Sequence, residues 1–320
     1  MLFSRSGQRN LITDVPGILV GNAEDHDVRT GVTVLTSPQP FVAGVHIMGG
    51  APGTAETDLL APDKLVDRVD ALVLSGGSAF GLAAADGVRT ALRKVGRGYQ
   101  VGGHSVPIVP TAILYDLNNG GQKNWPDATY QRLGQEALNN AALQFSLGNI
   151  GAGTGAQAGT RKGGLGSCSL LLEGGIHIGA LVAVNAVGSA ATPDGGHFWA
   201  APFEMYAEFG GKGLPSAVNG LAVPGIKTSV SAQENTTIAI IATDAKLDKA
   251  GAQRLSIAAH DGFARALVPA HTPFDGDLVF TAATGEHDGP ITAELMMQLC
   301  HAASVCMARA IARGVYEAAR

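Results

Sequence analysis

The chain has 320 residues, of which 46% are hydrophobic and 15% are charged, and its formal net charge at pH 7 is −5. This composition allows one large domain or two modest ones, and the lack of a basic stripe argues against nucleic acid as a partner. The three cysteines have neither metal-site spacing nor the pattern of a disulfide framework. No signal-peptide core is present, and no run reaches the roughly 18 apolar residues of a membrane span. We therefore expect a cytoplasmic protein without membrane contact.

Apolar runs bounded by turn residues predict the strands of this chain. The early ones lie at 17–24, 30–37, 41–50 and 71–74. The later ones lie at 106–118, 166–172, 177–184, 237–243 and 278–285. Apolar side chains at helical spacing predict helices at 82–92, 126–143, 247–262 and 291–318.

The order of these elements predicts the fold class. Strands come first and are followed by strand–helix–strand–helix units, which is typical of a layered α/β protein with mixed sheets covered by helices. The stretch 195–234 has weak periodicity and several Gly and Pro residues. A stretch of this kind predicts a long loop that is functional or mobile.

A glycine-rich motif at 151–156 satisfies G-x-G-x-x-A, the dinucleotide fingerprint, and Glu173 lies near the acidic position that accompanies it. The context argues against this interpretation, because the preceding run is a poor strand and too many glycines follow for a helix to begin. A dinucleotide-binding module without catalytic activity is kept as an alternative. Such a protein would run as one uncut band and bind NAD.

The turn at 74–81 contains Gly76 and Gly77 and places backbone N–H groups at a helix start, where an anion or oxyanion could bind. A tight turn packed against another backbone explains the same residues equally well. The histidines form no triad, and His46 and His177 lie within apolar runs that suit core or lining residues. The sequence contains neither H-E-x-x-H nor G-x-S-x-G, which argues against a zinc protease and a typical α/β-hydrolase.

Asp275 and Asp277 flank Gly276 immediately before a predicted strand. Strand alternation puts the two carboxylates on one side, where each perturbs the pKa of the other and both could hold an ammonium or hydroxyl group. Pro-x-Asp-Gly-Asp is also good turn chemistry. From the local residues alone, the turn is the favoured interpretation.

Asn235 and Thr236 stand where a polar segment enters an apolar strand. A threonine hydroxyl is a weak nucleophile without a base, but a threonine that begins a chain can use its own α-amine, whose unperturbed pKa is near ~8. Thr236 could become N-terminal by attacking the carbonyl of Asn235. This N→O acyl shift needs a strained peptide, an oxyanion donor and a water. Locally, an ordinary loop end is the favoured interpretation.

A set of motifs along most of the chain changes that balance: "DVPGILVGNAE", "ALVLSGGSAFGLAAADGV", "PTAILYDL", "GAGTGAQAGTRKGG", "VAVNAVG", "NTTIAIIATDA" and "DGDLVFTAATG". In this order they resemble the self-cleaving peptidases that include the L-aminopeptidase/D-esterase enzymes, the β-peptidyl aminopeptidases and the nylon-oligomer hydrolases. The resemblance implies a four-layer αββα sandwich. It also implies that 1–320 is a single precursor domain, which cuts itself into an α chain, 1–235, and a β chain, 236–320.

The resemblance assigns the cut to the bond between Asn235 and Thr236, with Thr236 as the nucleophile. Threonine after asparagine, together with the Asp-Gly-Asp motif, places the chain closest to the nylon-oligomer (6-aminohexanoate-oligomer) hydrolase branch. The implied catalytic residues are Thr236, Asn185 as oxyanion donor, Lys162 near the cleavage point, and Asp275 and Asp277 as groups that orient Thr236. The implied substrate-binding residues are Tyr115, Gly76 and Gly77.

The sequence therefore predicts an autoprocessed N-terminal-threonine amidohydrolase that cleaves short peptides or amide oligomers through an acyl-enzyme, with no metal and no cofactor. The resemblance further implies a homo-oligomer, a tetramer of αβ units. One alternative is an aminopeptidase that acts on amino-acid amides and short peptides. A second is an acyl transferase like ornithine acetyltransferase, in which an amine rather than water takes the acyl group.

Overall fold

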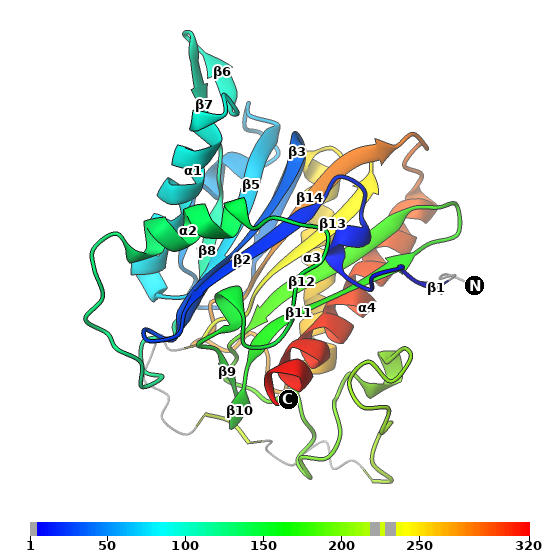
Figure 1. Ribbon diagram of the computed structural model, residues 1–320. Coiled ribbons are helices and arrows are strands. Elements are labelled where there is room, and N and C mark those ends of the chain that lie inside the picture. Colours follow the sequence, from blue (N-terminus) through cyan, green and yellow to red (C-terminus); the bar gives the residue numbers. More distant parts are fainter. Residues whose placement is uncertain (1–4, 218–224, 228–234) are drawn as a thin grey trace.

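The computed structural model describes residues 5–217, 225–227 and 235–320, which form four layers in the order helices, sheet, sheet, helices (Figure 1). One hydrogen-bonded path of nine strands runs through both sheets, with a tenth strand paired beside it, and the 18-residue strand β3 (Thr30–Ile47) belongs to each sheet. The first part of β3 pairs with β2 (Leu19–Asp25) and β5 (Arg68–Ser75), and its last part pairs with β14 (Leu278–His287). This architecture is the αββα sandwich that the resemblance implies.

The first sheet contains β2, β5, the first part of β3 and two short strands, β8 (Thr111–Ile113) and β4 (Thr54–Ala55). Its pairs are antiparallel except for β5 with β8. Along β5, Leu72 and Leu74 belong to the apolar cluster between the sheets, whereas Ala71 and Val73 pack with the helices outside. A strand that is covered on both faces produces this alternation.

The second sheet contains β14 and four strands on one side of it: β1 (Arg5–Ser6), β11 (Gly164–Leu171), β12 (His177–Val184) and β13 (Ile238–Ala245). Ile238 and Ile240 face the first sheet, while Ala239 and Ile241 face the outer helices. β13 and β14 run parallel. The residues that precede these two strands therefore meet at one edge of the sheet.

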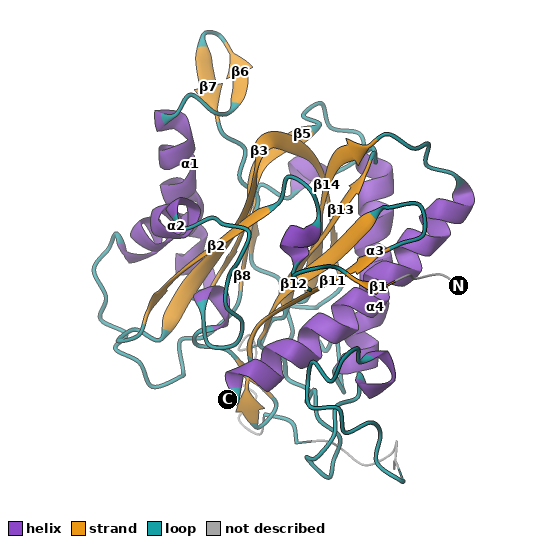
Figure 2. Ribbon diagram, turned by 45° about the vertical axis from the view of Figure 1, so that its right-hand side comes forward, coloured by secondary structure: helices purple, strands orange, loops and turns teal. Residues whose placement is uncertain are grey.

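Helices cover the outer face of each sheet (Figure 2). On the first sheet lie α1 (Ala84–Lys94) and α2 (Thr129–Asn139), and on the second lie α3 (Lys249–Ala266) and α4 (Ala293–Ala318). Three buried apolar clusters fill the spaces between the four layers. By length and composition α4 could cross a membrane, but 67% of its most apolar window is buried. Because α4 packs on β11, β12 and α3, it is a core helix.

Three predicted strands differ from the structure, and two of them differ because of proline. The runs at 30–37 and 41–50 are one strand, β3, whose pairing with β5 is irregular between Thr36 and Phe41, where Pro38 and Pro40 stand. Proline cannot donate to a ladder, so the strand continues through an irregularity rather than a turn. The run at 106–118 forms only the short strand β8.

The remaining segments are hairpins and loops. The motif at 151–156 forms a 3-10 turn, Gly151–Gly153, and the hairpin of β9 (Gln157–Ala158) and β10 (Arg161–Lys162) follows it, so the strand and helix of a dinucleotide site are both missing there. A second hairpin, β6 (Tyr99–Val101) with β7 (His104–Val106), projects beyond α1 (Figure 1). In the predicted loop, the described residues 195–217 and 225–227 contain one 3-10 turn, Ala201–Phe203, and residues 231–234 lie outside the described part.

Candidate active site

Thr236 lies two residues before β13, where the chain enters the second sheet. Asn235 forms an isolated parallel bridge with Asp275, which extends the pairing of β13 and β14 to the residues that precede them. The backbone N–H of Thr236 donates to the backbone oxygen of Asn185, just after β12, at 2.7 Å. Neighbouring backbone on two sides therefore positions Thr236, which is only 3% exposed.

The carbonyl of Asn235 lies between a hydrogen-bond donor and a nucleophile. The backbone N–H of Gly276 donates to this carbonyl oxygen at 3.0 Å. The Oγ1 hydroxyl of Thr236 donates to the same oxygen at 2.5 Å. If that hydroxyl attacks the carbonyl carbon, the N–H of Gly276 already points at the oxygen on which negative charge develops. The structure thus brings together the hydroxyl of Thr236, the carbonyl of Asn235 and an N–H donor on that carbonyl.

Gly276 can approach this closely because it has no side chain. A Cβ at this position would lie 2.7 Å from Thr236 Oγ1 and 2.5 Å from the backbone oxygen of Ala51. Both distances are well inside normal contact. Glycine between the two aspartates therefore serves the approach of its amide to the Asn235–Thr236 peptide.

The carboxylate of Asp275 binds backbone and a hydroxyl on the far side of this loop. Its Oδ1 accepts from the N–H of Val187 at 3.1 Å, and its Oδ2 accepts from the N–H and the Oγ1 of Thr272 at 3.0 and 2.5 Å. Burial, and then the neighbouring carboxylate of Asp277, raise the pKa of Asp275. Asp275 thus ties the segment after β12 to the loop before β14.

Asp277 holds the residue that follows the nucleophile. Its Oδ1 accepts from the N–H of Thr237 at 2.8 Å, and its Oδ2 accepts from the N–H and Nδ1 of His271 at 3.1 and 2.9 Å. Within the described part of the chain, neither carboxylate has a hydrogen bond to the hydroxyl of Thr236. The structure therefore places both carboxylates as groups that hold backbone around Thr236.

Three histidines form an aromatic cluster behind these carboxylates. His260 packs edge-on against His46 and His271, with ring centroids 5.1 and 4.9 Å away, and one of its ring nitrogens contacts the backbone oxygen of His46 at 3.1 Å. Burial lowers the pKa of His260 to about 3, and burial likewise lowers the pKa of His46. His260 and His46 are therefore neutral near pH 7. No function was predicted for this cluster from the sequence.

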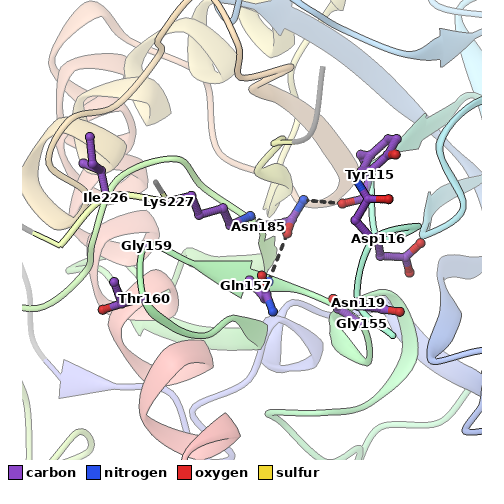
Figure 3. Close-up of a pocket in the computed structure, with 11 residues that line it drawn as sticks. Tyr115, Asp116, Asn119, Gly155, Gln157, Gly159, Thr160, Asn185, Ile226 and Lys227 are labelled. Carbon is purple, nitrogen blue, oxygen red and sulfur yellow. Dashed lines mark hydrogen bonds between the residues drawn. The ribbon is translucent and has the colours of Figure 1, made fainter. Parts of the chain in front are cut away.

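Asn185 is bound on both ends of its side chain (Figure 3). Its Nδ2 donates to the backbone oxygen of Tyr115 at 2.8 Å, while its Oδ1 accepts from the N–H of Gln157 at 3.0 Å and from Nζ of Lys227 at 3.1 Å. In the uncut chain, the donor on the carbonyl of Asn235 is the amide of Gly276. The role of Asn185 as an oxyanion donor for substrate stays a prediction.

A cavity of about 250 Å³ opens beside the nucleophile. Tyr115 lines it, as the resemblance implies, and so does Ile113. The full lining comprises Thr236, Tyr115, Ile113, Leu82, Ala79, Ser78, Gly53, Pro52 and Ala51. Its described lining is mainly apolar and contains no carboxylate, so it suits a small, uncharged part of a substrate.

Gly76 and Gly77 shape the turn that leads to this cavity but do not line it. Their N–H groups are occupied: that of Gly76 donates to a backbone oxygen at 2.9 Å, and that of Gly77 donates to Asp116 Oδ1 at 2.8 Å. Gly77 has a φ of +85°, and a Cβ on it would collide with the ring of Tyr130. These contacts agree with a tight turn packed against neighbouring backbone, which was the alternative to an anion-binding turn in the sequence analysis.

Lys162 lies in the β9–β10 hairpin, where it is paired with Gln157. Gln157 contacts Asn185, so Lys162 lies on the strand next to the one that reaches the site. Lys162 also lines a separate cavity of about 420 Å³. The described lysine that contacts Asn185 is Lys227. Its segment, 225–227, has no periodicity, so the sequence offered no signal for it. The sequence did not predict the amide of Gly276 as a donor, because a backbone N–H is present in nearly every residue type.

A model of peptidase family S58 matches residues 10–320 of the chain. An uncharacterized aminopeptidase of Mycobacterium tuberculosis is 42% identical over 330 residues, which cover 97% of this chain and 94% of the relative. A 6-aminohexanoate-oligomer endohydrolase of Kocuria sp. is 30% identical over 299 residues, which cover 90% and 78%. The aminopeptidase is clearly more similar to this chain than the endohydrolase is. The prediction that the chain is closest to the nylon-oligomer hydrolase branch is therefore not supported.

Two solved structures share the fold. A β-aminopeptidase from Burkholderia sp. matches with a TM-score of 0.71 at 24% identity, covering 98% of this chain and 88% of that chain. An L-aminopeptidase D-Ala-esterase/amidase from Ochrobactrum anthropi, described as a new variant among the Ntn hydrolase fold, matches with a TM-score of 0.70 at 22% identity and the same coverage. At these identities the likeness concerns the fold alone, and it agrees with the four layers described above.

Proposed function

The chain belongs to peptidase family S58, and from that premise we propose that it is a self-cleaving aminopeptidase with Thr236 as its N-terminal nucleophile. The observation that carries the proposal is the arrangement of the Asn235–Thr236 peptide. Its carbonyl oxygen accepts from the amide of Gly276 and lies 2.5 Å from the threonine hydroxyl. A hydroxyl and an amide donor on one carbonyl are the groups that an N→O acyl shift of Thr236 needs.

In maturation, Oγ1 of Thr236 attacks the carbonyl carbon of Asn235, and the N–H of Gly276 stabilises the oxyanion. The C–N bond then breaks, the nitrogen of Thr236 takes up a proton, and an ester joins Asn235 to the threonine oxygen. Water hydrolyses this ester. The products are a fragment 1–235 that ends in a carboxylate and a fragment 236–320 that begins with a free amine.

In turnover, the new α-amine accepts the proton of the Thr236 hydroxyl as the oxygen attacks a substrate amide. The backbone oxygen of Asn185, which accepts from this nitrogen at 2.7 Å in the uncut chain, keeps the amine beside the hydroxyl. Asp277 holds Thr237 in place through its amide. The acyl-enzyme that results is hydrolysed by water, and no cofactor takes part in any step.

The substrates that we propose are short peptides and amino-acid amides. Two findings support this class over long amide oligomers: the relative at 42% identity is named an aminopeptidase, and the cavity beside Thr236 measures only about 250 Å³. A small cavity suits the side chain of one terminal residue better than the middle of a polymer.

The test compares aminoacyl p-nitroanilides and dipeptides that have a free amine with their N-acetylated forms. An aminopeptidase cleaves the free-amine compounds and leaves the acetylated ones almost intact, and Thr236→Ala abolishes both maturation and cleavage. Equal rates on free and acetylated compounds would contradict an aminopeptidase. Activity that survives in Thr236→Ala would contradict the nucleophile.

The second candidate function is hydrolysis of 6-aminohexanoate oligomers, which is favoured by the 30% identity to an endohydrolase named for that substrate. Cleavage of internal bonds in a linear oligomer, faster than release of its terminal residue, would select it. An acyl transferase would instead show product in which an added amine such as ornithine carries the acyl group. Assembly into a tetramer of two-chain units stays a prediction, which light scattering on the purified protein tests.

A further inference from the structure

A second cavity, of about 420 Å³, is lined by Gln157, which contacts Asn185, and its wall carries positive charge. Three side chains on its wall are cationic or can become so: Arg29, Lys162 and His26. The remaining lining residues are neutral: Asn119, Asn149, Thr154, Gly155, Ala156 and Gln157. No carboxylate lines it within the described part of the chain. We call this space the cationic cavity.

The cations of this cavity are available to a ligand. Lys162 and Arg29 are exposed, and neither forms an ion pair with a described residue. Arg29 is oriented by one hydrogen bond, from Nη1 to the backbone oxygen of Asn119 at 2.8 Å, which leaves its other N–H groups open. A guanidinium held in this way can bind a carboxylate with two parallel hydrogen bonds.

The cationic cavity joins the catalytic site through a chain of shared walls. Gln157, Gly155 and Asn119 also line a middle cavity of about 230 Å³, which Tyr115, Asn185 and Lys227 line as well (Figure 3). Tyr115 in turn lines the apolar cavity beside Thr236. The three spaces therefore follow one another from an apolar end at the nucleophile to a cationic end at Arg29.

Hydrogen bonds connect the two ends of this row of cavities through Asn185. The N–H of Thr236 donates to the backbone oxygen of Asn185, and the N–H of Gln157, on the wall of the cationic cavity, donates to the side-chain oxygen of Asn185. An extended peptide advances about 3.5 Å per residue, so a peptide of a few residues has the shape that follows such a row.

We propose that the cationic cavity binds the free α-carboxylate of a short peptide substrate, with Arg29 as its main ligand and Lys162 as its second. The apolar cavity then takes the side chain of the residue that acylates Thr236, and the middle cavity takes the leaving residues. This assignment rests on the proposed aminopeptidase function, which it narrows to short peptides with an unblocked carboxyl end.

The test compares matched di- and tripeptides that end in a free carboxylate with the same peptides as C-terminal amides. We expect wild-type kcat/KM to be about tenfold higher for the free acids, mostly through a lower KM, because the carboxylate contact is present in both ground and transition states. Arg29→Gln should remove most of this preference and leave the rate on the amides unchanged. Arg29 is the decisive variant, because Lys162 also has an implied catalytic role.

Matched controls come from α1, where the exposed Arg93 and Lys94 lie away from all three cavities. Arg93→Gln and Lys94→Gln each remove the same charge and should keep the full preference. A tripeptide amide with a C-terminal glutamate separates an α-carboxylate from a side-chain carboxylate, and it should be cleaved like the other amides.

The outcomes separate the two proposals. A protein that cleaves neither acids nor amides contradicts the proposed function. Cleavage of both at equal rates in wild type, or a preference that Arg29→Gln keeps, overturns the carboxylate site while the peptidase stands. A preference that the control variants lose just as Arg29→Gln does reflects only net charge, and it overturns the site as well.

Discussion

Replacing Gly276 by alanine adds one methyl group at the point where the structure has least room for it. The Cβ would lie 2.5 Å from the backbone oxygen of Ala51 and 2.7 Å from Thr236 Oγ1. Relief to ordinary contact requires the loop to move by about 0.7 to 0.9 Å. Because Gly276 does not have a positive φ, alanine is compatible with the backbone itself. The effect is therefore steric, and it acts on the cleavage site.

The shift carries the amide of Gly276 away from the carbonyl of Asn235, which it now reaches at 3.0 Å. Loss of one oxyanion donor costs about 100- to 1,000-fold in rate. Overpacking also costs about 1–3 kcal/mol of unfolding free energy, which a domain of ordinary stability survives. We expect Gly276→Ala to fold and to mature at least about 100-fold more slowly than wild type.

The assay follows the conversion of freshly made precursor into two fragments by intact-mass spectrometry, with urea denaturation as a check on folding. Gly196→Ala is the matched control, because a Cβ there meets its nearest neighbour only at 3.8 Å. A folded Gly276→Ala protein that matures at the wild-type rate would refute the assignment of the oxyanion donor.

Two further predictions concern the groups behind the nucleophile. His260 has a pKa of about 3 in the folded chain and 6.5 in the unfolded chain. The unfolded chain therefore binds the proton more tightly, and the contribution of His260 to stability is complete above pH 6.5 and falls as the pH drops. Between pH 6.5 and 4.5 the unfolding free energy of wild type should fall by about 2–3 kcal/mol because of this residue. In His260→Gln, urea midpoints at the two pH values should differ less, and an unchanged difference would contradict the buried neutral base. Asp277→Asn turns an N–H toward either Thr237 or His271, which should lower the unfolding free energy by about 1–3 kcal/mol and slow maturation. A variant with the wild-type urea midpoint and rate would show that this carboxylate is dispensable.

Much of the fold could be predicted because its strands and helices have clear periodicity. β12 has the bounds that its apolar run predicts, 177–184, and α4 lies within the predicted 291–318. The strand boundary near Pro38 and Pro40 was wrong because the prolines interrupt the pairing with β5 without ending the strand. Residue type alone does not distinguish these two cases.

The site was harder to predict, because its chemistry depends on backbone. Thr236 and Asp275 lie close together because β13 and β14 pair in parallel. Both strands were predicted from the sequence. What the carboxylates bind did not follow: the structure shows them holding Val187 and Thr237 rather than the hydroxyl of Thr236. The donor on the carbonyl of Asn235 is an amide, which every residue except proline carries.

The proposed function depends most directly on the cut between Asn235 and Thr236. The intact mass of the purified protein shows whether this cut has occurred. For wild type, we predict two species, residues 1–235 and 236–320, whose masses add up to the precursor plus one water. For Thr236→Ala, we predict a single chain with the full precursor mass. A wild-type chain that stays uncut while it hydrolyses amides at full rate would contradict the N-terminal nucleophile, and with it the mechanism proposed for this protein.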